Sequence, residues 1–330
     1  MRINWIYSRV RTLALALAAV ALSGAMISCN NDDDDNASQP QTITDLVVAG
    51  DQFTILEAAV VKAGLADALR QGSLTVFAPT DAAFQEAGIP NAAAVTNSTT
   101  LTAAVLTDIL QYHVINQRVP AANIPTANNT AQPTIRPTNG TVFITKTSGG
   151  AVTVNGARVV QADVPASNGV IHVIDKVLMP PTGDLVQTLT RLNQQTPNTY
   201  NLILAAAQRA GANVLATLQA QGPFTVFIPT NAAITASNPA LTSEAAINAV
   251  PVATLQSILT YHVVPGRVFS TDLTTGNVAT AQTGTVAVNV GTGGVTLTGR
   301  GNGTNASRVT AANIVATNGV IHVIDRMLLP

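Results

Sequence analysis

The chain has 330 residues, of which 47% are apolar and only 10% are charged, and its formal net charge is -1. At roughly 100–200 residues per domain, this length predicts about two domains. The near-neutral charge, without a basic stripe, argues against a nucleic-acid partner. The single cysteine, Cys29, excludes a disulfide framework and a thiolate metal cage.

Residues 1–28 have the pattern of a secretory signal peptide. Three arginines precede an apolar run from Leu13 to Leu22, and small residues follow it. A membrane-spanning helix needs roughly 20 apolar residues, so this run is too short to be one. We therefore expect the segment to be no part of the fold.

Residues 29–40 are predicted to be a lipidated cysteine followed by an acidic, disordered tether. Cys29 directly follows the signal in a pattern that resembles a bacterial lipobox, although Met26 stands where Leu is usual. Asp32 to Asp35 repel one another and stay solvated. This acidic run resembles the export signal of Bacteroidetes surface lipoproteins. The resemblance implies an outer membrane lipoprotein that faces the cell exterior and contacts the membrane through its lipid only. The alternatives are an incidental cysteine, or a spacer that leaves the protein on the periplasmic face.

The rest of the chain is an internal repeat with a spacing of about 150 residues. Three segments occur twice: 75–84 and 225–234, 112–114 and 261–263, and 168–175 and 318–325. A unit this long is a domain and not a solenoid repeat. Pro180 and Pro181 mark the boundary, which predicts domains at residues 41–180 and 182–330.

Each copy begins with helical patterns. Residues 54–69 and 200–218 have helical periodicity, and Gly211 interrupts the second of these segments. A short strand over 74–77 is followed by a helix with Thr80 or Asp81 as its N-cap. A further helix over 101–112 has an apolar face that contains Leu101, Ala104, Val105 and Ile109.

The second part of each copy alternates with the period of a strand. Residues 141–145 and 151–154 predict a hairpin around Ser148 to Gly150, and residues 285–289 and 295–297 predict its counterpart. The strand over 170–174 has apolar residues on both faces, as a buried central strand does. Helices first and strands later predict an α+β fold.

The three repeated segments together resemble the fasciclin domain family. That family has a Thr-Val-Phe-Ala-Pro-Thr segment, a Tyr-His pair and an Asn-Gly-Val-Ile-His-Val-Ile-Asp strand, and this chain has each of them twice. The resemblance implies two tandem domains, each a wedge or sandwich of short β-strands packed with several helices. It also implies a secreted or anchored protein that functions in adhesion or surface binding. Copy one lacks the family's Val-Pro-Gly turn after the histidine, which copy two has at residues 264–266.

The four histidines are the first candidates for chemistry, and all of them lie in the repeated segments. The resemblance associates Tyr112 and His113, with Tyr261 and His262, with receptor binding, but their apolar neighbours favour packing at a helix end. His172 and His322 lie in apolar strands, where a neutral imidazole would tie the strand to a helix. Asp175 and Asp325 close the same strands and could pair with Lys176 and Arg326 or cap a turn.

The sequence gives no pattern for catalysis or for a cofactor. The histidines lack the local spacing of a metal site, no nucleophile motif is present, and no glycine-rich segment opens a helix. We therefore predict that the protein is not an enzyme and holds no metal or cofactor. The expected function is adhesion or binding to an extracellular protein, matrix component or glycan. The alternatives are a carrier of a small hydrophobic ligand or haem, an enzyme on the same scaffold, and a structural envelope spacer.

Overall fold

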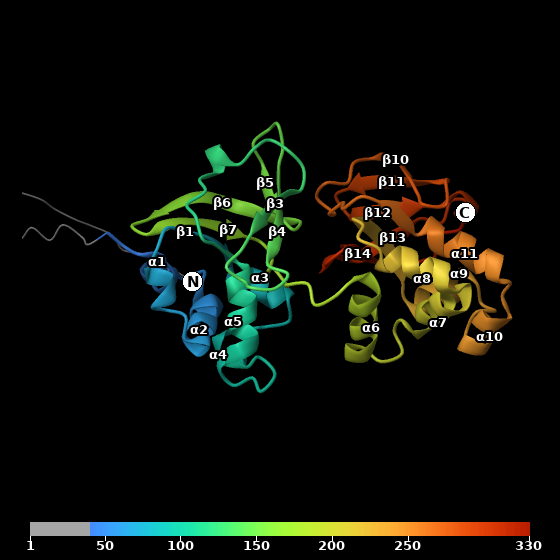
Figure 1. The fold of residues 1–330 in the computed structure, drawn as a ribbon, viewed down its shortest axis with the longest axis horizontal. Helices are drawn as coiled ribbons and strands as arrows, with labels where there is room; N and C mark the ends of the chain where they lie inside the picture. The colour runs from blue at the N-terminus through green and yellow to red at the C-terminus, as the bar shows by residue number, and fades with distance from the viewer. Residues whose placement is uncertain (1–39) are drawn as a thin grey trace, which may run out of the picture. The chain divides into compact units, whose positions relative to one another are not determined.

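The computed structural model describes residues 40–330, and these form two domains whose strands follow in the same order and which differ in their short 3₁₀ helices and in α8. Domain 1 contains α1 to β7, and domain 2 contains α6 to β14 (Figure 1). The elements of domain 1 are α1 Ile43–Ala49, α2 Thr54–Ala63, η1 Ala68–Arg70, β1 Leu74–Pro79, α3 Asp81–Glu86, α4 Ala92–Thr96, α5 Ala103–Tyr112, β2 Val114–Ile115, η2 Ala121–Asn123, β3 Thr130–Pro133, β4 Thr141–Lys146, β5 Val152–Val154, β6 Ala157–Ala166 and β7 Gly169–Ile174. Those of domain 2 are α6 Leu185–Gln195, α7 Asn201–Ala210, α8 Ala212–Gln219, β8 Phe224–Pro229, α9 Asn231–Ser237, α10 Glu244–Ala249, α11 Val252–Tyr261, β9 Val263–Pro265, β10 Gly276–Ala279, β11 Thr285–Gly291, β12 Gly294–Thr298, η3 Arg300–Asn302, β13 Ser307–Ala316 and β14 Gly319–Ile324.

The sheet of domain 1 has seven strands in the order β2-β1-β7-β6-β5-β4-β3. β7 pairs with β1 in parallel and with β6 in antiparallel orientation, and each of its residues is buried. The expectation of a buried inner strand is therefore confirmed. The predicted hairpin is confirmed as well, because β4 and β5 pair in antiparallel orientation.

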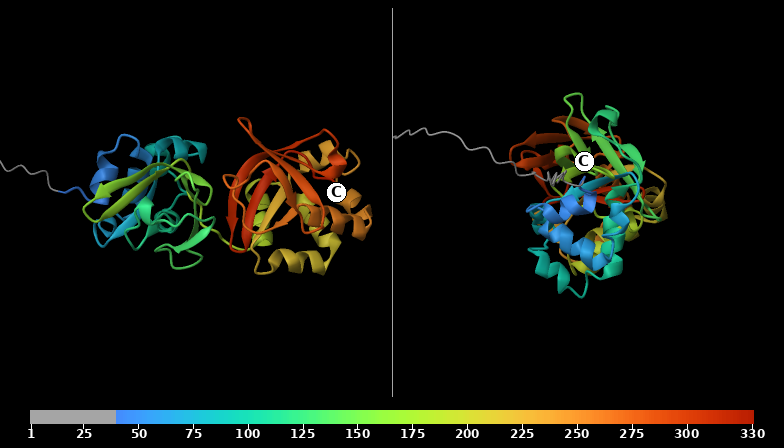
Figure 2. Two further views of the ribbon diagram at one scale, coloured as in Figure 1. Left: turned by 90° about the horizontal axis from the view of Figure 1, so that it is seen from above. Right: turned by 90° about the vertical axis from the view of Figure 1, so that its left-hand side faces the viewer.

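The sheet of domain 2 repeats this topology with the order β10-β11-β12-β13-β14-β8-β9. β14 pairs with β8 in parallel, as β7 does with β1. The predicted hairpin of this copy is confirmed by the antiparallel pairing of β11 and β12. In Figure 2 the orange and red strands of this domain run side by side, with yellow helices beside them.

The first long helix is shorter than predicted. The periodicity suggested a helix over residues 54–69, but α2 ends at Ala63. Gly64 follows it with φ +70, and its N–H caps the carbonyls of Val60 and Val61. A left-handed residue stops a helix, and glycine takes that conformation at no steric cost. In domain 2 the interruption predicted at Gly211 is present, between α7 and α8.

The helix after β1 begins as predicted, but the buried face of α5 does not lie where periodicity placed it. Thr80 is the N-cap of α3, and its hydroxyl accepts from the Ala83 N–H. In α5 the buried residues are Leu106, Leu110 and Tyr112, whereas Val105 is 41% exposed. α5 carries apolar residues on several faces, so its own sequence does not select the one that packs against α2.

Each domain buries apolar side chains in two layers. In domain 1, one cluster joins α2, α4 and α5 to one face of β1 and β7, and a second lies among the strands around Phe77 and Tyr112. Domain 2 has equivalent clusters, the second of them around Phe227 and Tyr261. These layers match the expected α+β fold of short strands packed with helices. None of the helices in residues 40–330 combines the length and apolar character that crossing a bilayer requires.

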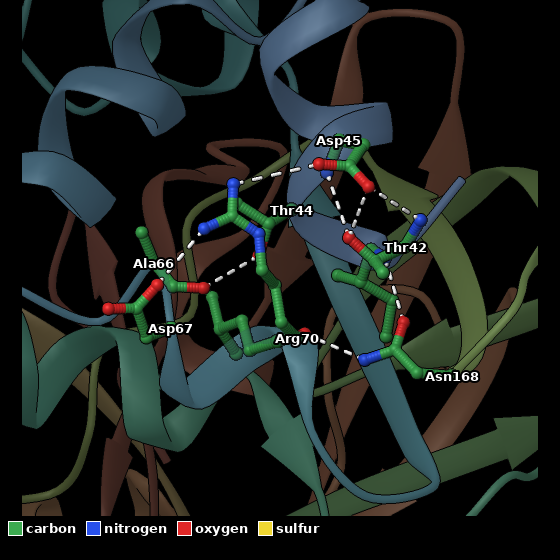
Figure 3. Close-up of polar contacts among 9 residues, drawn as sticks. Thr42, Thr44, Asp45, Ala66, Asp67, Arg70 and Asn168 are labelled. Carbon is green, nitrogen blue, oxygen red and sulfur yellow. Dashed lines mark hydrogen bonds and ion pairs between the residues drawn. The ribbon is translucent and has the colours of Figure 1, made fainter. Parts of the chain in front are cut away.

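Polar contacts fix the first helix of domain 1 (Figure 3). Thr42 and Asp45 form a capping box at the start of α1. The guanidinium nitrogens of Arg70 lie 3.6 Å from a carboxylate oxygen of Asp45 and 3.0 Å from one of Asp67. These ion pairs are exposed to solvent and contribute little, whereas the cap satisfies free N–H groups of the helix.

Candidate binding site

Tyr112 lies at the end of α5 and is fully buried, with 0% exposure. Its hydroxyl donates to the Thr141 carbonyl at 2.9 Å and accepts from the Asn155 amide at 2.9 Å. Burial raises the pKa of Tyr112 to about 12, and the hydrogen bond from Asn155 opposes this shift. The side chain thus ties α5 to β4 and presents no atom to a partner.

His113 follows Tyr112 and is also buried. Its Nδ1 lies 2.8 Å from the Ile109 carbonyl, and its Nε2 accepts from the Leu178 N–H at 2.9 Å. Because a carbonyl only accepts, Nδ1 carries the proton. Burial lowers the pKa of His113 to about 4. The ring is therefore neutral at pH 7 and has no free nitrogen, although its edge lines a pocket of about 350 Å³ in domain 1.

The second pair, Tyr261 and His262, makes similar contacts, although Tyr261 accepts from the Arg300 N–H at 3.0 Å where Tyr112 accepts from Asn155. The Tyr261 hydroxyl donates to the Thr285 carbonyl at 2.5 Å. His262 bonds the Ile258 carbonyl at 2.8 Å and accepts from the Leu328 N–H at 3.0 Å. Burial lowers the pKa of His262 to about 4. Both pairs are internal connectors, and a receptor-binding role for their side chains would require them to move.

His172 lies in the middle of β7 and is 1% exposed. Its Nε2 donates to the Val119 carbonyl at 2.9 Å, and its Nδ1 accepts from the Asp163 N–H at 3.3 Å. Asp163 lies in an irregular part of β6 and has a left-handed backbone with φ 59. The histidine therefore ties β7 to a loop and to this irregularity, and the expected tie to a helix is wrong. Its ring also stacks on Phe77, with centroids 5.8 Å apart.

His322 makes the same contacts in β14. Its Nε2 donates to the Val268 carbonyl at 2.9 Å, and its Nδ1 accepts from the Asn313 N–H at 3.3 Å. Its ring stacks on Phe227 with centroids 5.5 Å apart. Burial lowers the pKa of His322 to about 4. The two copies thus use one arrangement around this histidine.

The aspartates that end these strands accept from the neighbouring strand. Asp175 accepts from the Arg158 N–H at 2.7 Å, and Asp325 from the Arg308 N–H at 2.7 Å. The suggested pairing of Asp175 with Lys176 is wrong, because Lys176 pairs with Glu86 on α3. The aspartates hold the end of the β6–β7 and β13–β14 pairs in register.

The asparagine in the same repeated segment has a role that its sequence pattern did not indicate. Asn168 accepts from the Ile43 N–H at 2.9 Å and donates to the Leu69 carbonyl at 2.8 Å (Figure 3). Asn318 accepts from the Leu185 N–H at 2.9 Å and donates to the Leu218 and Ala220 carbonyls. The repeated Asn-Gly dipeptide was interpreted only as a turn, but its side chain joins the first helix of each domain to the sheet.

These contacts leave the histidines without free ligand atoms. Within residues 40–330, no group of three or more histidine, cysteine or acidic side chains could hold a metal ion. Cys29, the expected lipid attachment site, lies outside the described residues, as do the signal and the acidic run. The landmarks are internal connectors, so the exposed surface and the pocket beside His113 remain as places for a ligand.

Comparison with known proteins agrees with this repeated architecture. The fasciclin domain family model matches residues 51–180 and 198–330. The chain belongs to the fasciclin domain family. Its two halves are tandem fasciclin domains of mixed α+β structure.

Two curated proteins illustrate the range of its relatives. The chain is 31% identical over 260 residues to the transforming growth factor-beta-induced protein ig-h3 of Sus scrofa, covering 78% of this chain and 35% of that protein. It therefore spans about a third of that relative's length. It is 38% identical over 141 residues to protein sll1483 of Synechocystis, covering 42% of this chain and 74% of that protein.

A solved structure of two fasciclin domains from fasciclin I, described as an insect cell adhesion molecule, is also similar. It covers 84% of this chain and 96% of its own, with 20% sequence identity and a TM-score of 0.37.

Proposed function

We propose that this chain is a surface adhesion or binding protein that recognises an extracellular protein, a matrix component or a glycan. The observation that carries the proposal is that fasciclin domains occupy residues 51–180 and 198–330. The domain limits proposed here are 41–180 and 182–330.

The internal contacts support recognition through exposed loops and strand faces. Tyr112 and Tyr261 are both 0% exposed, and His113 and His262 are both 2% exposed. These side chains hold the fold and do not reach a partner. The same commitment of the histidines to internal hydrogen bonds supports our proposal that the chain is not an enzyme, since a general base needs a free nitrogen.

We further propose that a lipid on Cys29 anchors the protein to the outer membrane and that the domains face the cell exterior. Sequence alone supports this placement, through the residues around Cys29 and the acidic run after it. Protease shaving of intact cells tests it, and loss of both domains is expected. Protection until the outer membrane is broken would place the domains on the periplasmic face.

The binding function is tested with the full chain carrying Cys29→Ser, so that no lipid is attached. The purified protein is applied to immobilised collagen, fibronectin, laminin and a glycan array, and bound protein is measured against concentration. Saturable binding to one of these is expected. Absence of saturable binding to every one, with folded protein, contradicts the proposal.

Variants of the tyrosine pair separate folding from recognition. Tyr112→Phe and Tyr261→Phe remove buried hydroxyls that donate to the Thr141 and Thr285 carbonyls. Both variants are expected to lower stability by about 1 kcal/mol and to leave the dissociation constant within twofold. Lost binding with unchanged stability would assign recognition to the Tyr-His pair itself.

A further inference from the structure

Domain 1 has an apolar pocket of about 350 Å³ between α3, α5 and the segment that follows β7. Its apolar lining includes the side chains of Phe84, Ala87, Leu106, Leu110, Val177 and Met179. No charged carboxylate, lysine or arginine lines it, and the lining His113 is neutral with both nitrogens bonded. Ligand pockets commonly span about 300–1,000 Å³ and are mostly apolar. This pocket has the size and chemistry for a small uncharged molecule.

Domain 2 fills the corresponding position with its own chain. The Leu178 N–H bonds His113 as the Leu328 N–H bonds His262. The residues that precede these leucines, Val177 and Met327, are therefore equivalent. Met327 is 5% exposed and lies in the buried cluster that includes Ile234. Val177 is shorter and only partly buried. The internal repeat therefore shows which kind of group this position accepts: an unbranched apolar chain.

The polar half of the site also differs between the domains. In domain 2 the Met327 N–H donates to the Ser237 hydroxyl at 2.9 Å. Ala87 is the equivalent of Ser237, seven residues after the N-cap threonine of the helix, and it has no hydroxyl. Among the hydrogen bonds of residues 40–330, none is donated by the Val177 N–H. Ala87 and Val177 both line the pocket, so the residue that carries this N–H forms part of the pocket wall.

The mouth of the pocket carries an exposed methionine. Met179 is 56% exposed although its side chain is apolar. Methionine is flexible and polarisable, and it adapts to ligands of different shape. An exposed, adaptable apolar group at the entrance favours binding over simple packing.

We propose that domain 1 alone binds a small uncharged apolar molecule that carries a hydrogen-bond acceptor, such as a ketone or an ester. The apolar part would contact Phe84, Leu106 and Leu110, and its acceptor would receive the Val177 N–H. Met327 and Ser237 occupy the equivalent apolar and polar positions in domain 2. The inference does not depend on adhesion to a macromolecule.

The first test uses Prodan, a neutral naphthalene dye with one ketone, whose emission shifts to the blue in an apolar environment. It is titrated into the full chain carrying Cys29→Ser. Saturable binding with one dye per chain is expected. Two equal sites, or no saturable blue shift, would overturn the proposal.

Exchanges between the repeats test where the dye binds. Val177→Met with Ala87→Ser gives domain 1 the two groups of domain 2 and is expected to weaken Prodan binding at least tenfold. The control is Val160→Met, which adds the same side chain on β6, where Val160 is 59% exposed, and is expected to change nothing. Equal affinity in the exchanged protein and the control would refute the site.

A measurement on the unaltered pocket keeps the proposal testable if the exchanged protein does not fold. The amide resonance of Val177 is followed by NMR while 2-octanone or octane is added. The ketone is expected to move the Val177 amide proton downfield in a saturable manner, and octane to shift the neighbouring methyl groups without that change. An unmoved Val177 amide during saturable ketone binding would overturn the assignment.

Discussion

The two domains share the polar contacts within their sheets but differ in the helical layer that packs on them. His172 and His322 bond equivalent groups, and so do Asp175 and Asp325. By contrast, the segment after the last strand, which packs on the helices, has Val177 in domain 1 and Met327 in domain 2. Buried polar groups need defined partners, whereas apolar contacts tolerate changes of shape. The repeat thus separates contacts that define the fold from positions free to acquire different ligands.

The turn after the Tyr-His pair shows the same distinction. Copy one lacks the Val-Pro-Gly sequence, and Gln117 stands where copy two has Gly266 with φ +99. Yet the Thr75 hydroxyl donates to the Gln117 carbonyl at 2.6 Å, and the Thr225 hydroxyl to the Gly266 carbonyl at 2.7 Å. The threonine of the strand keeps the turn in place, so the altered sequence changes the exposed surface and not the attachment.

The largest expected effect is a loss of stability in acid, which equivalent histidines bring to both domains. Burial lowers the pKa of His113 in domain 1 and of His262 in domain 2 to about 4 from 6.5. The unfolded chain binds protons between these values and the folded domain does not. Each such histidine therefore stabilises fully above pH 6.5, and this contribution is lost as the pH falls toward 4. The loss is about 3 kcal/mol per histidine.

We therefore expect each domain to lose about 3 kcal/mol through the histidine of its Tyr-His pair as the pH falls from 6.5 to 4. Hydrogen exchange read by mass spectrometry, with peptides assigned to each domain, measures this directly. Unchanged protection of both domains down to pH 4 would contradict the expected loss.

The next largest effect is expected from the strand histidines, and here the domains should behave alike. His172→Ala or His322→Ala removes a ring stacked on phenylalanine and leaves a carbonyl and an N–H unpaired. Each change is expected to cost about 3 kcal/mol of the free energy of unfolding of its own domain. Urea denaturation at pH 7.5 measures it, with the exposed Arg118→Ala as control. A loss in one domain only would show that the shared geometry does not imply shared energetics.

A smaller, unequal effect is expected at the asparagines. Asn168 makes two hydrogen bonds with its side chain and Asn318 makes three. Replacement by Ala is expected to cost about 2 kcal/mol in domain 1 and about 1 kcal/mol more in domain 2. Faster hydrogen exchange in α1 and α6 should accompany these losses. Unchanged exchange in both helices would argue against the proposed attachment.

The sequence was sufficient for features determined by neighbouring residues. It predicted the hairpin of β4 and β5, an N-cap at Thr80 or Asp81 and the interruption at Gly211, each of which depends on local backbone preference. The end of α2 at Gly64 carried a similar local signal, but apolar residues beyond the glycine continued the helical pattern. The end of the helix was therefore mispredicted at a place where two local signals disagreed.

Features determined by distant contacts were not predicted. The parallel pairing of β1 with β7 joins Leu74 to Gly169, and nothing near either residue specifies the other. The roles of Asn168 and Val177 depend on the helices that lie against them. The Tyr-His and strand landmarks were correctly located and correctly expected to pack in the interior. The groups that they bond, such as the Thr141 and Val119 carbonyls, lie far along the chain and were not predicted.

The smallest expected effect concerns the N-termini of α2 and α7. The side chain of Asp81 bonds the first of these and that of the equivalent Asn231 bonds the second. Asp81 accepts from the Ile55 N–H at 2.9 Å and from the Thr54 hydroxyl at 2.7 Å. Asn231 accepts from the Leu202 N–H at 3.1 Å and donates to the Asn198 carbonyl at 2.7 Å. A carboxylate near a helix N-terminus stabilises by about 0.3–1 kcal/mol, because the free N–H groups there carry partial positive charge.

Asp81→Asn is therefore expected to destabilise domain 1 by about 1 kcal/mol, since it removes both the charge and one acceptor. The reciprocal Asn231→Asp gains a charge but loses its donor to the Asn198 carbonyl, so it should change domain 2 by less than about 0.5 kcal/mol. Urea denaturation measures both. Repeating it in 1 M NaCl, where screening acts over about 3 Å, should reduce the loss in Asp81→Asn. A loss that is independent of salt would assign the effect to the hydrogen bond with Thr54 alone, and the charge of Asp81 would then contribute nothing to the difference between the domains.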